Sequence, residues 1–192
     1  MRIIAGRFRS RTLEAPAGLG TRPTSDRLRE TLFNVLAPRI EGARFLDLFA
    51  GSGAVGLEAL SRGAASVEFV ERAPAALIVL KKNLAPLGIE QGFRIHGAAV
   101  GAVLRKMKPA TSNPDAAFDV VFLDPPYDGA AEYANTLGLL GGDAGGLLAD
   151  EALVIAEHRR KEKLDLQYGL LSRTRMLEQG DAALSFYALQ RS

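Results

Sequence analysis

The feature that most constrains the fold is a regular alternation of short apolar segments with helical segments between residues 44 and 158. The apolar segments read as strands and lie at residues 44–49, 66–71, 93–99, 118–124 and 152–158. The segments between them have helical patterns and lie at residues 50–63, 74–88, 100–107 and 129–140. Parallel strands need crossover connections, and short helices supply them. The alternation therefore predicts the α/β class, with a mostly parallel sheet and helices on both faces.

The two ends of the chain depart from this alternation. Residues 2–16 read as two short strands around a turn near residues 6–10, followed by a helix over residues 25–37. Residues 170–180 and 182–190 read as two strands joined at a Gly-Asp turn, which predicts an antiparallel end to the sheet. We therefore expect seven strands with an antiparallel C-terminal strand, plus a small N-terminal β-hairpin and helix. The expected division is a basic extension over residues 1–40 and one domain over residues 41–192.

Composition narrows the class of protein. The chain has 192 residues with no cysteine and two histidines, which excludes disulfides and cysteine-based zinc sites and predicts no metal. The N-terminal segment lacks the continuous apolar stretch of a signal peptide, and no window approaches the roughly 20 apolar residues of a membrane span. We expect a soluble cytoplasmic protein with no membrane partner, and we expect a monomer.

Charge is distributed unevenly along the chain. Residues 1–44 contain nine arginines and four acidic residues, a net of +5, although the whole chain carries only +2. A basic N-terminal part on a slightly acidic body suggests a polyanionic partner. The alternative is an arginine-rich surface that only contacts water. The candidate nucleic-acid contacts are Arg2, Arg7, Arg9, Arg11, Arg22 and Arg27, of which Arg7, Arg9 and Arg11 alternate as they would on one face of a strand.

A glycine-rich loop follows the strand at residues 44–49. Its sequence, Gly-Ser-Gly-Ala-Val-Gly at residues 51–56, matches the dinucleotide fingerprint, and Glu71 follows 20 residues after Gly51. Glycines allow a sharp turn and close approach of a ligand, and an acid after the next strand can accept hydrogen bonds from ribose hydroxyls. The alternative is a tight turn that binds nothing.

Asp47 decides between nucleotide ligands because it lies just before this loop. A carboxylate there would repel a pyrophosphate but suits a ligand that carries an ammonium group. S-adenosylmethionine is such a ligand, with S-adenosylhomocysteine as its product, and we favour it over a nicotinamide cofactor. Asp47 can also cap backbone amides of the loop. The predicted binding residues are Asp47, Ala50, Gly51, Gly53 and Glu71, with Thr24 at a helix N-terminus and the backbone near Ala98 as further candidates.

The strand at residues 118–124 ends in Asp-Pro-Pro-Tyr at residues 124–127. The two prolines have a fixed φ and no N–H, so their carbonyls stay available as acceptors beside the Asp124 carboxylate. Tyr127 adds a flat apolar face with a polar tip. Such a site suits a planar ring with an exocyclic amino group, which a flipped nucleic-acid base presents. We predict Asp124, Pro125, Pro126 and Tyr127 as the catalytic residues; the alternative is a turn that merely ends a strand.

Together these motifs resemble a known family. "FLDLFAGSGAVGLEALSRGA", "FVE" and "LDPPY" resemble the motifs of those class I S-adenosylmethionine-dependent methyltransferases that modify amino groups of nucleic-acid bases. The resemblance implies a Rossmann-like domain. The start "MRIIAGRFRSRTLEAP" with "TRPTSDRLRETLFNVL" is similar to the bacterial 16S rRNA guanine-N2 methyltransferases of the D type. The resemblance implies a guanine of 16S rRNA as target, presented by a 30S subunit or an assembly intermediate, and places the N-terminal arginines on RNA phosphates. The stretch after the third strand, residues 96–101, lacks the acid that such families often carry there.

Three other functions remain open at this point. An adenine-N6 or cytosine-N4 methyltransferase acting on DNA or RNA would use the same motifs. A nicotinamide-dependent oxidoreductase would use the glycine loop, and a non-catalytic RNA-binding module would use the arginines alone.

Overall fold

The computed structural model describes residues 1–15, 26–109, 116–126 and 130–190 of the chain. Its strands are β1 (Arg44–Leu48), β2 (Ser66–Val70), β3 (Phe93–His96), β4 (Phe118–Leu123), β5 (Leu148–Arg159), β6 (Gln167–Tyr168), β7 (Leu171–Gln179) and β8 (Ala182–Leu189). Its helices are α1 (Asp26–Leu36), α2 (Ala54–Ser61), α3 (Pro74–Leu84), α4 (Val100–Lys106) and α5 (Ala130–Leu140), with short 3₁₀ turns η1 (Ala85–Leu87) and η4 (Gly145–Leu147). Apart from the N-terminal hairpin, the predicted elements are confirmed within a few residues.

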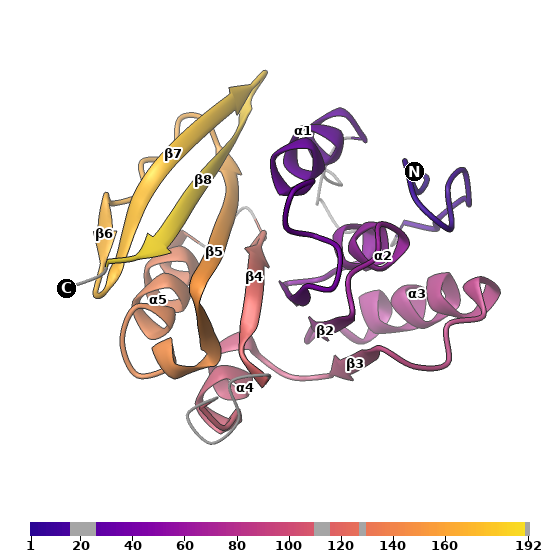
Figure 1. Ribbon diagram of the computed structural model, residues 1–192, viewed down its shortest axis with the longest axis horizontal. Coiled ribbons are helices and arrows are strands. Elements are labelled where there is room, and N and C mark those ends of the chain that lie inside the picture. The colour runs from indigo at the N-terminus through magenta and orange to yellow at the C-terminus, as the bar shows by residue number, and fades with distance from the viewer. Residues whose placement is uncertain (16–25, 110–115, 127–129, 191–192) are drawn as a thin grey trace.

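All of these strands join in one sheet with the order β3-β2-β1-β4-β5-β8-β7-β6. The strands from β3 to β5 are parallel, and β8, β7 and β6 are antiparallel to their neighbours. The long β7–β8 hairpin rises beside β5 (Figure 1). The α/β class and the antiparallel C-terminal end are thus confirmed. The expected number of seven strands was one too low, because β6 is a two-residue strand, too short to leave a periodic pattern.

Helices cover both faces of the sheet, as the alternation predicts. One hydrophobic cluster joins α1, α2 and α3 to residues such as Phe45, Phe69 and Phe122. A second cluster on the opposite face joins α4 and α5 to residues such as Leu46 and Leu123. Side chains of a strand alternate between faces, so each central strand contributes to both cores. A sheet buried on both faces gives its strands their nearly continuous apolar sequences.

The N-terminal segment packs into the first of these clusters through Ile3, Phe8 and Leu13. The predicted hairpin is reduced to one antiparallel bridge between Arg2 and Thr12, and turns occupy residues 5–10. The expectation that Arg7, Arg9 and Arg11 share one face of a strand was therefore wrong. Alternation of charge was a poor guide because the backbone turns sharply at Gly6, which has a φ of +84°. A Cβ there would lie 1.8 Å from the carbonyl oxygen of Ser61, so only glycine allows this close contact with α2.

Candidate active site

A cavity of about 320 Å³ opens at the carboxyl ends of β1, β2 and β4. Ligands of open parallel sheets bind at this edge. Predicted site residues that line the cavity are Asp47, Ala50, Gly51, Glu71, Ala98, Asp124 and Pro126. The predicted glycine-loop residues and the start of the Asp-Pro-Pro-Tyr segment therefore face one shared space.

Two predicted residues lie behind the cavity wall, and three fall outside the described ranges. Pro125 is buried and does not line the cavity. Gly53 has a φ of +79° and begins α2, and a Cβ there would lie 2.2 Å from Leu80 Cδ1. Its role in the structure is thus a tight turn packed against α3. Thr24, Arg22 and Tyr127 lie outside the residues that the structure describes.

The glycine loop is held by two acids. The Gly51 amide donates to Glu71 Oε2 at 2.9 Å, and the Ala73 amide donates to Glu71 Oε1 at 2.7 Å. The Gly56 amide donates to Asp47 Oδ2 at 2.9 Å. Asp47 thus caps the loop, as one of the two interpretations of this residue predicts. Each acid leaves acceptor capacity unused by these bonds, since a carboxylate can accept about four hydrogen bonds.

Asp47 is almost fully buried, at 2% exposure. Burial raises the pKa of its carboxyl to about 7; the Gly56 amide opposes this effect and the charge of Glu71 adds to it. A carboxyl that is costly to ionise because it is buried becomes a strong partner for a cation that lies beside it. The electrostatics of the loop therefore favour a cationic ligand group.

Asp124 follows β4 directly, and the pKa of its carboxyl is raised well above the ordinary value. Burial is the main cause, and the nearby carboxyl groups of Glu157 and Asp47 add to it. Leu123 is aligned with Ala156 in the β4–β5 register, so Asp124 and Glu157 follow at the same edge of the sheet. Perturbed carboxyl groups that converge in a cavity are a recognised mark of functional sites.

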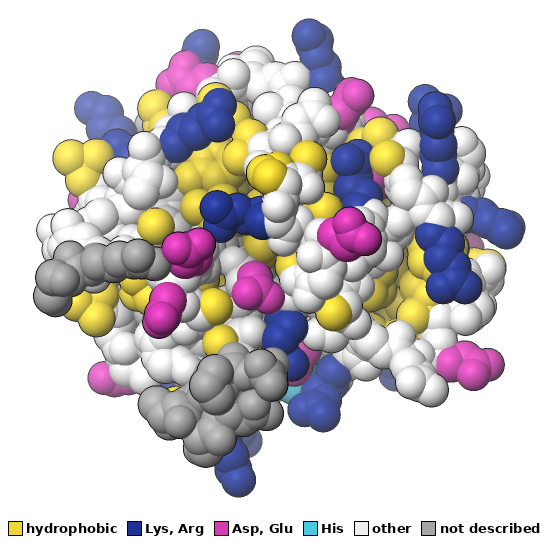
Figure 2. All heavy atoms as spheres, viewed as in Figure 1, with side chains coloured by type: hydrophobic (Ala, Val, Ile, Leu, Met, Phe, Trp, Pro, Cys, Tyr) yellow, Lys and Arg dark blue, Asp and Glu magenta, His cyan; other side chains and the backbone are white. Residues whose placement is uncertain are grey.

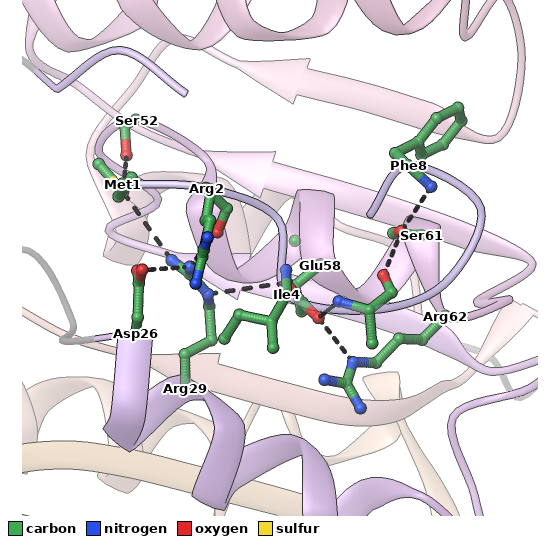
Figure 3. Close-up of polar contacts among 12 residues, drawn as sticks. Met1, Arg2, Ile4, Phe8, Asp26, Arg29, Ser52, Glu58, Ser61 and Arg62 are labelled. Carbon is green, nitrogen blue, oxygen red and sulfur yellow. Dashed lines mark hydrogen bonds and ion pairs between the residues drawn. The ribbon is translucent and has the colours of Figure 1, made fainter. Parts of the chain in front are cut away.

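The N-terminal segment forms part of the cavity wall through Met1 and Ala15, a role that the sequence did not predict. A buried polar cluster fixes this segment to α2 (Figure 3). Glu58, which is fully buried, accepts from the Ile4 amide at 2.7 Å, from the Ala5 amide at 3.0 Å and from Arg62 Nε at 2.7 Å.

The buried Arg29 guanidinium completes this cluster from α1. It donates to Asp26 Oδ1 at 2.9 Å and to the Arg2 carbonyl, and its Nε lies 3.8 Å from Glu58 Oε2. Burial lowers the pKa of Arg29, and Asp26 and Glu58 oppose that effect. One arginine and one glutamate therefore join the N-terminal segment, α1 and α2 beside the cavity. The pattern Arg-Glu at residues 29–30 gave no sign that Arg29 is buried while Glu30 is exposed.

Glu58→Gln is expected to lower the free energy of unfolding by about 3 kcal/mol, because it leaves the buried Arg29 without a full counter-charge. Urea unfolding at pH 7.5 measures this. Glu90→Gln, at an exposed glutamate, serves as the matched control and should change stability by less than about 0.5 kcal/mol. If Glu58→Gln and Glu90→Gln both change the free energy of unfolding by the same small amount, the buried polar cluster does not hold the N-terminal segment in place.

Within the part of the chain that the structure describes, no helix is long and apolar enough to span a membrane. The same residues include no cluster of three or more metal-ligating side chains.

Comparison with known proteins places this site in a family. The family described as "Conserved hypothetical protein 95" matches residues 1–188. YlbH of Bacillus subtilis, a candidate rRNA methyltransferase by its name, is 36% identical over 97% of this chain and 98% of its own length. Ribosomal RNA small subunit methyltransferase D of Escherichia coli is 45% identical over 82% of this chain and 74% of its own.

A solved structure agrees with these relatives. The structure of YhhF from Escherichia coli, named as a candidate methyltransferase, superposes with a TM-score of 0.83 at 37% identity and covers 99% of this chain and 98% of its own. The chain therefore belongs to the conserved hypothetical protein 95 family, the family of the bacterial ribosomal RNA methyltransferases of the D type.

Proposed function

We propose that this protein transfers a methyl group from S-adenosylmethionine to the exocyclic N2 amino group of a guanine in 16S rRNA. The observation that carries the proposal is the shared cavity, in which the glycine loop with Asp47 and Glu71 faces Asp124 of the Asp-Pro-Pro segment. The names of the relatives support ribosomal RNA of the small subunit as the substrate. We propose a 30S subunit or an assembly intermediate as the form in which the RNA is presented.

The residues of the cavity fit S-adenosylmethionine. A Cβ at Gly51 would meet only the Phe49 carbonyl, at 4.0 Å, so the main chain is open to the cavity there. Val70, Val100 and Phe122 offer apolar surface for a purine, while Glu71 can accept from ribose hydroxyls and Asp47 can pair with an ammonium group. When bound, the donor supplies a methyl group on a positively charged sulfur. The two carboxyl groups would repel the pyrophosphate of a dinucleotide.

The acceptor base is proposed to lie against Asp124, Pro126 and Tyr127, with the buried Pro125 fixing the backbone between Asp124 and Pro126. An exocyclic amino group is a weak nucleophile because its lone pair is delocalised into the ring. Asp124 and the proline carbonyls can accept hydrogen bonds from its two hydrogens and orient the nitrogen toward the donor. The carboxylate also stabilises the positive charge that develops on the nitrogen, and its raised pKa suits it to take up the released proton.

Phosphate contacts are proposed for the N-terminal arginines. Arg2, Arg7, Arg9, Arg11 and Arg27 are all exposed. The buried Glu58 and Arg29 hold the backbone of residues 2–5 beside the cavity. Arginines on such a fixed segment can orient the RNA relative to the reactive groups while carrying little sequence information themselves.

The proposal is tested by incubating the protein with labelled S-adenosylmethionine and, in parallel, 30S subunits, free 16S rRNA and DNA, all from cells that lack this enzyme. We expect labelled methyl in 30S subunits or in free 16S rRNA, and none in DNA. Methyl transfer to DNA alone would show that DNA is the substrate and would contradict the proposed rRNA substrate. Absence of transfer together with binding of NAD would overturn the assignment of the donor.

A further inference from the structure

We propose that residues 159–163, named here the β5 basic turn, form a second RNA-binding surface on the β5 side of Asp124, away from the segment that carries Arg2, Arg7, Arg9 and Arg11. This inference rests on the proposed RNA substrate. The turn has the sequence Arg-Arg-Lys-Glu-Lys, four cations and one acid with a net of +3. The side chains of Arg159, Arg160, Lys161 and Lys163 are all exposed.

The sheet topology places this turn at the functional edge. β5 is parallel to β4, and Leu123 is aligned with Ala156. Asp124 comes one residue after Leu123, and Arg159 comes three residues after Ala156. At about 3.3 Å per residue, the turn starts roughly 10 Å beyond the aligned pair, on the same edge as the cavity.

The strand order puts Asp124 between the two basic surfaces. The N-terminal segment is bound to α2, which connects β1 and β2, on one side of β4. The β5 basic turn follows the next strand on the other side. Met1 of this segment lines the cavity. A polyanion that contacts both the start of the N-terminal segment and the β5 basic turn would therefore pass the mouth of the cavity, where its bases can reach Asp124.

The backbone of this turn is fixed by a set of buried side chains. Tyr133 Oη donates to the Glu157 carbonyl at 2.8 Å, and Tyr187 Oη donates to the Asp165 carbonyl at 2.9 Å. Between these points, His158 Nε2 lies 2.9 Å from Ser185 Oγ and Nδ1 lies 2.9 Å from the Arg159 carbonyl. Burial lowers the pKa of His158, so this ring stays neutral and acts as a tether. A rigid turn loses little conformational entropy when its cations meet phosphates.

Neighbouring elements connect the β5 basic turn to α1. The Arg160 amide donates to the Asp181 carbonyl at 2.8 Å in the β7–β8 turn, and Thr31 Oγ1 of α1 donates to Gln179 Oε1 at 3.1 Å. Arg27 is one helical turn before Thr31 and is exposed. Lys and Arg side chains, with Asp and Glu side chains between them, lie along the upper rim of the molecule in Figure 2, where the β7–β8 turn lies in Figure 1. The acids Glu30, Glu162, Asp165, Glu178 and Asp181 lie along the same edge, so the excess of positive charge is confined to the β5 basic turn itself.

The test compares the double variant Lys161→Gln/Lys163→Gln with Lys106→Gln/Lys108→Gln. The control pair is also exposed, but it lies at and just after the end of α4, which leads to the amino end of β4 at the opposite edge of the sheet. Filter binding to 16S rRNA and to 30S subunits over a range of salt concentrations gives affinity without requiring turnover. Donor affinity by calorimetry and the KM and kcat of methyl transfer complete the comparison.

The Lys161/Lys163 variant should bind RNA about fivefold to tenfold more weakly, with a smaller salt dependence by about one counter-ion per lost contact. Donor affinity and kcat should stay within about twofold of wild type, and the control pair should match wild type throughout. Unchanged RNA affinity and salt dependence in the Lys161/Lys163 variant would overturn the proposal. If wild type binds RNA but transfers no methyl group, the proposed function fails, and the binding comparison still decides the role of the turn.

Discussion

Asp124→Ala is expected to lower the rate of methyl transfer about a hundredfold to a thousandfold while leaving donor affinity within a few fold of wild type. The substitution removes the carboxylate that would orient the amino group and stabilise its developing charge, and such groups contribute factors of about 10²–10³ or more. Asp47 and Glu71, the proposed donor-binding residues, keep their hydrogen bonds to the glycine loop. Single-turnover transfer of labelled methyl to rRNA, with calorimetry for the donor, measures both quantities.

Asp150→Ala provides the control for this prediction. Asp150 is an exposed aspartate at the amino end of β5, on the opposite edge of the sheet. Its replacement should leave both rate and donor affinity unchanged. A rate for Asp124→Ala within tenfold of wild type would show that Asp124 only ends a strand.

Asp47→Asn should make the protein more stable at high pH and worse at binding the donor. Wild-type Asp47 has a pKa of about 7 in the fold against 3.8 as the reference value, so the folded state holds a proton that the unfolded chain releases. The stabilising effect of that proton is complete below about pH 4 and is lost as pH rises through 7. Asparagine cannot ionise, and the variant should gain about 3 kcal/mol on wild type between pH 5 and pH 8.

Denaturant unfolding of both proteins at pH 5 and pH 8 measures this difference. Asp124 titrates in both proteins, and its pKa is raised partly by the charge of Asp47, so the difference between the two proteins measures Asp47 together with its coupling to Asp124. At pH 8 the variant should also bind S-adenosylmethionine about tenfold to a hundredfold more weakly, since a charged hydrogen bond to the ammonium group is lost. Stability curves that run parallel from pH 5 to pH 8, or unchanged donor affinity, would contradict this account of Asp47.

The sequence predicted the parallel part of the fold well because its signals are local. A buried strand such as residues 118–123 needs a continuous apolar run, and the glycine loop needs its glycines. Topology then dictates that Asp47, Glu71 and Asp124 meet at the carboxyl edge, and the cavity contains all three.

The features that the sequence did not predict depend on contacts between distant parts of the chain. Glu58 has the appearance of a helix surface residue, yet it is buried by the N-terminal segment, more than 50 residues away in sequence. Met1 and Ala15 line the cavity for the same reason. The alternating arginines suggested a strand, but the turn at Gly6 and its contact with Ser61 determined the backbone there. The spacing of residue types within a segment does not show which distant segments that segment will contact in the fold.

The most direct test of the central claim is the identity of the nucleoside that receives the methyl group. After transfer to 30S subunits or free 16S rRNA, the RNA is digested to nucleosides and the labelled product is identified by mass spectrometry against synthetic standards. We predict N2-methylguanosine, present with wild type and lost with Asp124→Ala. Methylated adenosine or cytidine in place of N2-methylguanosine would contradict the proposed guanine-N2 specificity.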